Sequence, residues 1–264
     1  MTPVLLIGAG RMGSALLSGW QASKAFDFSD LMIRAPRPND ACAEAAGSGA
    51  RVNPSDEEIA RARTVVLCVK PQKWREVAPE FDRLLAAEAV IVSVLVGTRA
   101  ADLSEGFGGR LIARVLPTTA VANATGVTSL YAPDPAAAAA ARALFEPVST
   151  VVSLEDEPLM DAAGAVSASG AAYVYAFARA LEEAGAAEGL PDEAARALAR
   201  ATVASAANWM VDSGGEPADL IAQVASPGGT TQAALAVLDG EDGLRPLLRG
   251  AVAAAVRRAR ELAS

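Results

Sequence analysis

Between residues 4 and 152, short apolar runs alternate with longer segments whose apolar residues recur at helical spacing. Continuous apolar runs of this length are typical of parallel strands that are buried on both faces. The predicted strands are 4–7, 30–34, 51–52, 64–69, 90–96, 111–116, 126–131 and 148–152. Helices are predicted directly after the first strand, from 53 onward, over 72–85 and over 135–145. This alternation predicts an α/β fold with a doubly wound sheet.

The pattern changes near Ser153, where the predicted strands end and Ala-rich helical segments begin. Helices are predicted over 156–187, 191–212, 217–223, 231–238 and 245–262. Gly- and Pro-containing turns separate them, which is typical of helix boundaries. The chain is therefore predicted to hold two domains, one with the sheet over 1–152 and an all-α domain over 153–264.

The first apolar run leads directly into Gly8-Ala9-Gly10-Arg11-Met12-Gly13, and helical spacing follows. Gly8 permits a tight turn, Gly10 lets a pyrophosphate approach the backbone, and Gly13 lets the helix pack close to the sheet. The amide groups and the dipole at the N-terminus of that helix attract the anion. A glycine-rich turn without a ligand is the alternative, but the position directly after a strand favours a dinucleotide. We expect a Rossmann-type domain whose cofactor contacts include Gly8, Ala9, Gly10, Arg11 and Met12.

The end of the second predicted strand indicates which dinucleotide binds. That strand ends in Arg34, Arg37 follows, and no acidic residue lies between Leu31 and Asn39. An acidic side chain here holds the ribose hydroxyls of NAD, whereas an arginine can hold the 2′-phosphate of NADP. Two solvated arginines beside a Pro-rich turn are the alternative. The residues favour NADPH, with NADH as a weaker cofactor. Further contacts are expected where the fourth strand ends, at Val69, Lys70 and Pro71.

The composition of the chain excludes several classes of binding and catalysis. The 264 residues carry a net charge of −8, so non-specific binding of nucleic acid is not expected. The N-terminus lacks the pattern of a signal peptide and no segment is apolar enough for a membrane span, so we expect a cytoplasmic protein. The chain contains no His, which excludes Ser-His-Asp and Cys-His catalysis and His-based metal sites. No metal is expected, and the chemistry is left to carboxylates, Lys, hydroxyls, backbone amides or a cofactor.

The helical half is rich in Ala and Gly. Small side chains let helices pack closely, but each of them buries little apolar area. A domain of this composition has a marginal core when it is alone. Burial against a second copy would stabilise it, so we expect a homodimer or a larger homo-oligomer that forms through the C-terminal helices.

The segment Ser226-Pro227-Gly228-Gly229-Thr230-Thr231 resembles the signature of the pyrroline-5-carboxylate reductases. The glycine loop after the first strand and the segments 69–72, 114–117 and 161–173 are similar to other parts of that family, in the same order. The resemblance therefore covers the whole chain.

The resemblance implies an oxidoreductase that reduces a C=N bond. NADPH would deliver hydride to 1-pyrroline-5-carboxylate and give L-proline, the last step of proline biosynthesis. Thr231 would hold the ring nitrogen and Lys70 would neutralise charge near the nicotinamide. For these two residues the alternatives are a capped helix start and a solvated lysine. The substrate carboxylate would lie in an anion nest, and the substrate contacts would be Ser226, Gly228, Gly229, Thr230 and Thr231.

Several positions depart from the usual residues of that family: Thr118, Ala120, Gly164, Ala168, Ala171, Gly215 and Ala225. They leave room for a related imine reductase that acts on another cyclic imino acid, such as a six-membered piperideine carboxylate. A non-catalytic NADP-binding protein is a second alternative, although the intact 226–231 segment speaks against it. A β-hydroxyacid dehydrogenase would need a Lys in the helical domain, and the sequence has none after Lys73.

Overall fold

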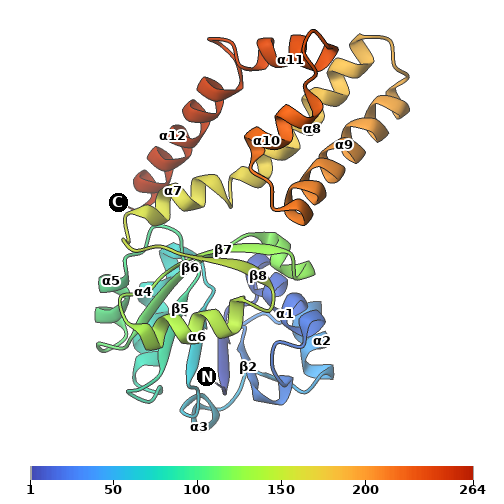
Figure 1. The fold of residues 1–264 in the computed structure, drawn as a ribbon. Helices are drawn as coiled ribbons and strands as arrows, with labels where there is room; N and C mark the ends of the chain where they lie inside the picture. Colours follow the sequence, from blue (N-terminus) through green and yellow to red (C-terminus); the bar gives the residue numbers. More distant parts are fainter. Residues whose placement is uncertain (1, 264) are drawn as a thin grey trace. The chain divides into compact units, whose positions relative to one another are not determined.

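A computed structural model describes residues 2–263 and contains one eight-stranded sheet in the order β3-β2-β1-β4-β5-β6-β7-β8 (Figure 1). The pairs from β3 to β6 are parallel, β7 runs antiparallel to β6, and β8 is parallel to β7. The strands are β1 Val4–Ile7, β2 Leu31–Arg34, β3 Arg51–Val52, β4 Thr64–Leu67, β5 Val90–Ser93, β6 Ile112–Pro117, β7 Gly126–Tyr131 and β8 Ser149–Ser153.

Helices cover both faces of this sheet, which confirms the doubly wound Rossmann-type fold. Alternate strand residues face the two sides, so Val4 and Leu6 pack with one set of helices and Leu5 and Ile7 with the other. The first side holds α1 (Arg11–Ser23), α2 (Asp40–Gly47) and α6 (Pro135–Phe145). The second holds α3 (Asp56–Ile59), α4 (Trp74–Asp82) and α5 (Ala100–Gly106).

The remaining helices follow the sheet. They are α7 Leu159–Val166, α8 Gly170–Ala187, α9 Asp192–Ser213, α10 Pro217–Val224, α11 Thr230–Leu238 and α12 Leu244–Ala263. The chain forms two compact units: Ser169–Ala255, here the helical unit, and the rest, here the sheet unit. The unit boundary lies later than the predicted domain boundary at 152, because α7 packs against β7 of the sheet. How the functions divide between the predicted domains stays a prediction.

Two parts of the pattern differ from the structure. The sequence predicts a long helical stretch over 156–187 that only glycine interrupts, but this stretch forms two helices, α7 and α8, with a break around Ser167. The Ser167 hydroxyl donates to the carbonyl of Ala163 at 2.8 Å, a side-chain bond that competes with the helical pattern. The predicted strands 64–69 and 90–96 are also too long, since β4 ends at Leu67 and β5 at Ser93.

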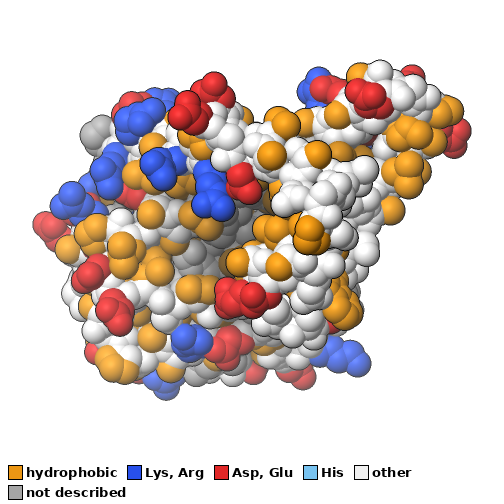
Figure 2. Space-filling view, turned by 45° about the horizontal axis from the view of Figure 1, so that its top comes forward, with side chains coloured by type: hydrophobic (Ala, Val, Ile, Leu, Met, Phe, Trp, Pro, Cys, Tyr) orange, Lys and Arg blue, Asp and Glu red, His pale blue; other side chains and the backbone are white. Residues whose placement is uncertain are grey.

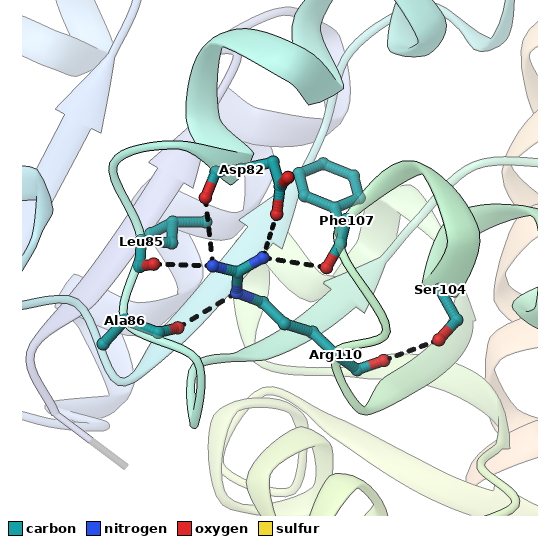
Figure 3. A network of polar contacts seen from close by, with 6 residues as sticks. All are labelled: Asp82, Leu85, Ala86, Ser104, Phe107 and Arg110. Carbon is teal, nitrogen blue, oxygen red and sulfur yellow. Dashed lines mark hydrogen bonds and ion pairs between the residues drawn. The ribbon is translucent and has the colours of Figure 1, made fainter.

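A buried arginine joins the C-terminal ends of α4 and α5 (Figure 3). Arg110 forms an ion pair with Asp82, and its guanidinium also donates to four backbone carbonyl groups. Those carbonyls belong to Asp82, Leu85, Ala86 and Phe107, at distances between 2.6 and 3.0 Å. Carbonyl groups at a helix C-terminus have no partner within the helix, and the side chain supplies donors to those of Asp82 and Leu85. The carbonyls of Ala86 and Phe107 also accept from the amides of Ala89 and Arg110.

Within the described residues, none of the helices has the length and apolar character that a membrane crossing requires.

Candidate active site

The glycine loop between β1 and α1 has the close packing that its sequence predicts. Gly8 has a φ of +99°, and a Cβ on it would collide with the carbonyl of Cys68 at the end of β4. A Cβ on Gly13 would collide with the carbonyl oxygen of Gly8, so α1 lies directly against the turn. Both positions therefore need glycine for steric reasons that do not depend on a ligand.

Gly10 differs from Gly8 and Gly13, the other two glycines of the motif. Among the described residues, no heavy atom outside its immediate chain neighbours lies within 4 Å of the position that a Cβ would take. The space next to Gly10 is therefore open, at the carboxyl edge of the sheet and at the N-terminus of α1. Ala9 and Met12 are half-buried, and Arg11 is exposed. Open backbone amides at a helix N-terminus fit a pyrophosphate, so the residues present fit a dinucleotide.

The thiol under this loop is chemically inert. Cys68 is buried, and burial raises the pKa of its thiol to about 12. At neutral pH the thiol is therefore protonated, and it packs as a small apolar group beneath Gly13.

The end of β2 carries the arginine that the sequence assigns to the cofactor. Arg34 Nη2 lies 3.1 Å from Glu80 Oε1 of α4, and both side chains are partly exposed. Ile33, the residue before Arg34 on β2, packs on the side of α1 and α2. Successive side chains of a strand point to opposite faces, so Arg34 points to the other face of the sheet. Arg37, three residues later, is exposed. Its role and that of Arg34 stay predictions.

Asn53 was not singled out from the sequence, yet it shapes the same region. Its backbone has a φ of +53°, and its side-chain oxygen accepts a hydrogen bond from the amide of Ala35 at 3.0 Å. Its own amide donates to the carbonyl of Ile33 at 2.8 Å. Asn is one of the few residues that tolerate this conformation, and its place directly after β3 is the local signal.

The exit of β4 lies at the carboxyl edge of the sheet, as predicted. Val69 and Pro71 are half-buried, and Lys70 is exposed at the start of a short 3₁₀ helix, Pro71–Lys73. An exposed lysine at this edge can meet a cofactor, but the same exposure suits a solvated side chain.

The signature segment forms a turn ahead of α11 in the helical unit. Gly228 has a φ of +71°, and the amide of Gly229 donates to the carbonyl of Ser226 at 3.0 Å. The helix begins at Thr230, so the N-cap is Gly229, which has no side chain to form a capping bond. The structure therefore contradicts the interpretation of Thr231 as an N-cap: this residue lies second in the helix and is half-buried.

Gln232 adds a contact that the sequence did not suggest. Its side-chain oxygen accepts a hydrogen bond from the amide of Gly228 at 2.6 Å. The amides of Gly228 and Gly229 are therefore both bonded within the loop. The first amides of α11, from Thr230 to Gln232, have no carbonyl within the helix to which they can donate.

Two of the positions that depart from the usual residues of the family, Thr118 and Gly164, have structural contacts in the sheet unit. The hydroxyl of Thr118 accepts a hydrogen bond from the amide of Val127 at 3.0 Å and so joins the end of β6 to β7. A Cβ on Gly164 of α7 would lie 3.2 Å from Leu116 Cδ1 of β6, so a small residue suits this contact.

Comparisons with known proteins place the chain. One family profile, described as pyrroline-5-carboxylate reductase dimerisation, matches residues 157–262, and another, described as NADP oxidoreductase coenzyme F420-dependent, matches residues 3–97. A pyrroline-5-carboxylate reductase of Pisum sativum is 36% identical over 260 residues, covering 97% of this chain and 94% of the relative. The chain belongs to the pyrroline-5-carboxylate reductase family.

Solved structures agree with this assignment to the pyrroline-5-carboxylate reductases. The enzyme of Coxiella burnetii has a TM-score of 0.91 and 28% identity, and the match covers 100% of this chain and 99% of the other. A pyrroline carboxylate reductase of Plasmodium falciparum, solved with NADP bound, has the same fold, with a TM-score of 0.83, 23% identity and coverage of 100% and 98%. The predicted order of a Rossmann-type domain and an all-α part is thus the order of this family.

Proposed function

We infer that this chain catalyses the NADPH-dependent reduction of 1-pyrroline-5-carboxylate to L-proline, the last step of proline biosynthesis. The observation that carries the inference is the similarity over nearly the full length to enzymes of this name. The open glycine loop supports a dinucleotide, and the loop ahead of α11 supports an anionic substrate.

The reduction requires little general acid–base catalysis from the protein. Bound NADPH supplies the hydride, and a protonated cyclic imine is already an electrophile, so a histidine is not required. The chain's own residues hold the ring in reach and stabilise its charges. In this proposal the Thr231 hydroxyl binds the ring nitrogen, and Lys70 balances charge near the nicotinamide.

The carboxylate of the substrate is proposed to lie on α11. Because the amides of Gly228 and Gly229 are bonded within the loop, the amides of Thr230 and Thr231 are the better donors. In this arrangement Ser226, Gly228 and Gly229 shape the turn. The helix dipole adds to the attraction of the carboxylate.

A substrate comparison tests the function. Purified protein is given NADPH with either 1-pyrroline-5-carboxylate or the six-membered piperideine carboxylate, and the loss of NADPH absorbance is followed. We expect a kcat/KM at least tenfold higher for the five-membered ring, since one methylene in a fitted pocket changes binding by about 1–3 kcal/mol. A preference for the six-membered ring would favour the related imine reductase. Binding of NADPH without turnover of either compound would favour a non-catalytic protein.

We propose that a second copy of the chain covers an apolar groove in the helical unit. The groove lies between α9 and α10, has a volume of about 690 Å³, and includes Trp209, Met210 and Ile221. Trp209 is 58% exposed, although a large apolar side chain is usually buried. Leu198 and Val224 of the same groove are also exposed, and Figure 2 shows apolar side chains on one face of the molecular surface. The family profile over 157–262 is named for dimerisation, which favours a copy of the chain as the occupant.

A charge placed in the groove should separate the subunits. Met210→Asp is expected to shift the molar mass in light scattering from an oligomer to a monomer at micromolar concentration, because an unpaired charge in an apolar interface costs several kcal/mol. Val152→Asp on the edge strand β8 is the matched control, since Val152 is similarly exposed but lies outside the groove. An unchanged mass for Met210→Asp, or a monomeric parent protein, would show that this groove is not the interface.

We propose that the protein is located in the cytoplasm, as the sequence predicts. Fractionation of cells that express the tagged protein is the direct measurement.

A further inference from the structure

Asn39 connects two segments that both border the dinucleotide site. Its side-chain amide nitrogen donates to the carbonyl of Ala9 at 2.9 Å and to the hydroxyl of Ser14 at 2.9 Å. Its side-chain oxygen accepts from the amide of Cys42 at 3.2 Å and so caps α2. One side chain thus joins the glycine loop to the helix that follows β2.

The contact with Ala9 fixes the orientation of the Gly10 amide, which would face the pyrophosphate. The Ser14 hydroxyl donates to the same carbonyl at 3.2 Å, so the Ala9 oxygen is held from two sides. Because a trans peptide is planar, fixing this oxygen also fixes the amide of Gly10, which points to the opposite side. The space beside Gly10 is open, which is where a pyrophosphate would approach.

The capping contact with α2 fixes the end of the segment that would hold the 2′-phosphate of the cofactor. Only Ala35, Pro36, Arg37 and Pro38 lie between the end of β2 and Asn39. Two prolines restrict this segment, so its path follows from its two fixed ends, β2 and Asn39. Arg37 is exposed within it, whereas Arg34 is engaged with Glu80. Arg37 is therefore the better candidate for holding a 2′-phosphate.

We propose that Asn39 is a positioning residue for cofactor choice: it sets the place of Arg37 relative to the amide of Gly10, so that the 2′-phosphate and the pyrophosphate are held at the same time. The inference rests on the proposed use of NADPH. NADH lacks the 2′-phosphate and needs only the loop, so it depends less on this connection. A residue that merely caps α2 would affect the stability of the fold and treat both cofactors alike.

Asn39→Ser separates the two roles. Serine is as good an N-cap as asparagine, but its short side chain has no amide to donate to Ala9. The Kd values for NADPH and NADH are measured by fluorescence titration of the full chain without substrate, so the outcome does not depend on which imine is reduced. The melting temperature is recorded for each variant. Arg37→Ala is measured in parallel as the loss of the phosphate ligand itself.

For Asn39→Ser we expect NADPH to bind about tenfold more weakly and NADH at most about threefold more weakly, with the melting temperature nearly unchanged. Arg37→Ala should weaken NADPH about tenfold to a hundredfold and leave NADH unchanged. Asp134→Ala is the matched control, because Asp134 caps α6 by accepting from the amide of Ala136 at 2.7 Å and has no part in the cofactor site. It should change neither Kd. Equal losses for both cofactors in Asn39→Ser, or unchanged Kd values, would overturn the proposal.

Discussion

Replacing Arg110 with Met is expected to lower the melting temperature by about 10 °C and to leave kcat per folded molecule unchanged. The guanidinium has five N–H groups, and all of them are used, four on backbone carbonyls and one on Asp82. Arg110 is 8% exposed, so water does not replace these partners when the side chain is removed. Breaking a buried pair from one side costs about 3–5 kcal/mol, and the loss here lies toward the lower end because the Asp82 side chain is 38% exposed. A kcal/mol corresponds to about 2–4 °C at this chain length.

Two variants show whether geometry or charge explains the loss. Arg110→Lys keeps the charge, but an ammonium has three donors and no planar fork, so most of the loss should remain. Arg63→Met removes an exposed ion pair with Glu88, and its melting temperature should change little. If Arg110→Lys melts like the parent protein, charge alone is sufficient and the carbonyl contacts contribute little.

The sheet could be predicted because its strands are buried on both faces and therefore read as continuous apolar runs. The same rule placed the ends of β4 and β5 too late. Cys68 and Val69 extend the apolar run after β4, and Val94 to Val96 extend the run after β5, although these residues already form the loops at the carboxyl edge. Hydropathy cannot distinguish a strand from a buried loop that continues it.

The candidate site was predictable where the chemistry is local. The glycine loop and the turn at 226–231 each lie within a few residues, and backbone geometry requires glycine at Gly8, Gly13 and Gly228. Contacts between distant residues were not predictable. Arg34 meets Glu80 across 46 positions and Asn39 meets Ala9 across 30, and no local pattern specifies either pair. Gln232 is close in sequence, but its contact with Gly228 depends on the turn that glycine makes possible.

The hydroxyl of Thr231 is expected to matter more for turnover than for folding. Thr231 is the second residue of α11 and is half-buried, beside the amides proposed to hold the carboxylate. The helix is capped by Gly229, so removing the hydroxyl takes away no capping bond, and the melting temperature should change by no more than a few degrees.

Thr231→Val keeps the shape of the side chain and removes the hydrogen-bonding group, so it is the sharpest test. If the hydroxyl binds the ring nitrogen more tightly as the hydride arrives, its loss lowers kcat as well as kcat/KM. We expect kcat/KM for 1-pyrroline-5-carboxylate to fall about tenfold to a thousandfold, with the Kd for NADPH near that of the parent. Thr231→Ser restores the hydroxyl and should recover most of the rate. A Thr231→Val protein with full kcat/KM would mean that another group binds the ring nitrogen, because neither capping nor packing at this position can replace a lost hydrogen bond.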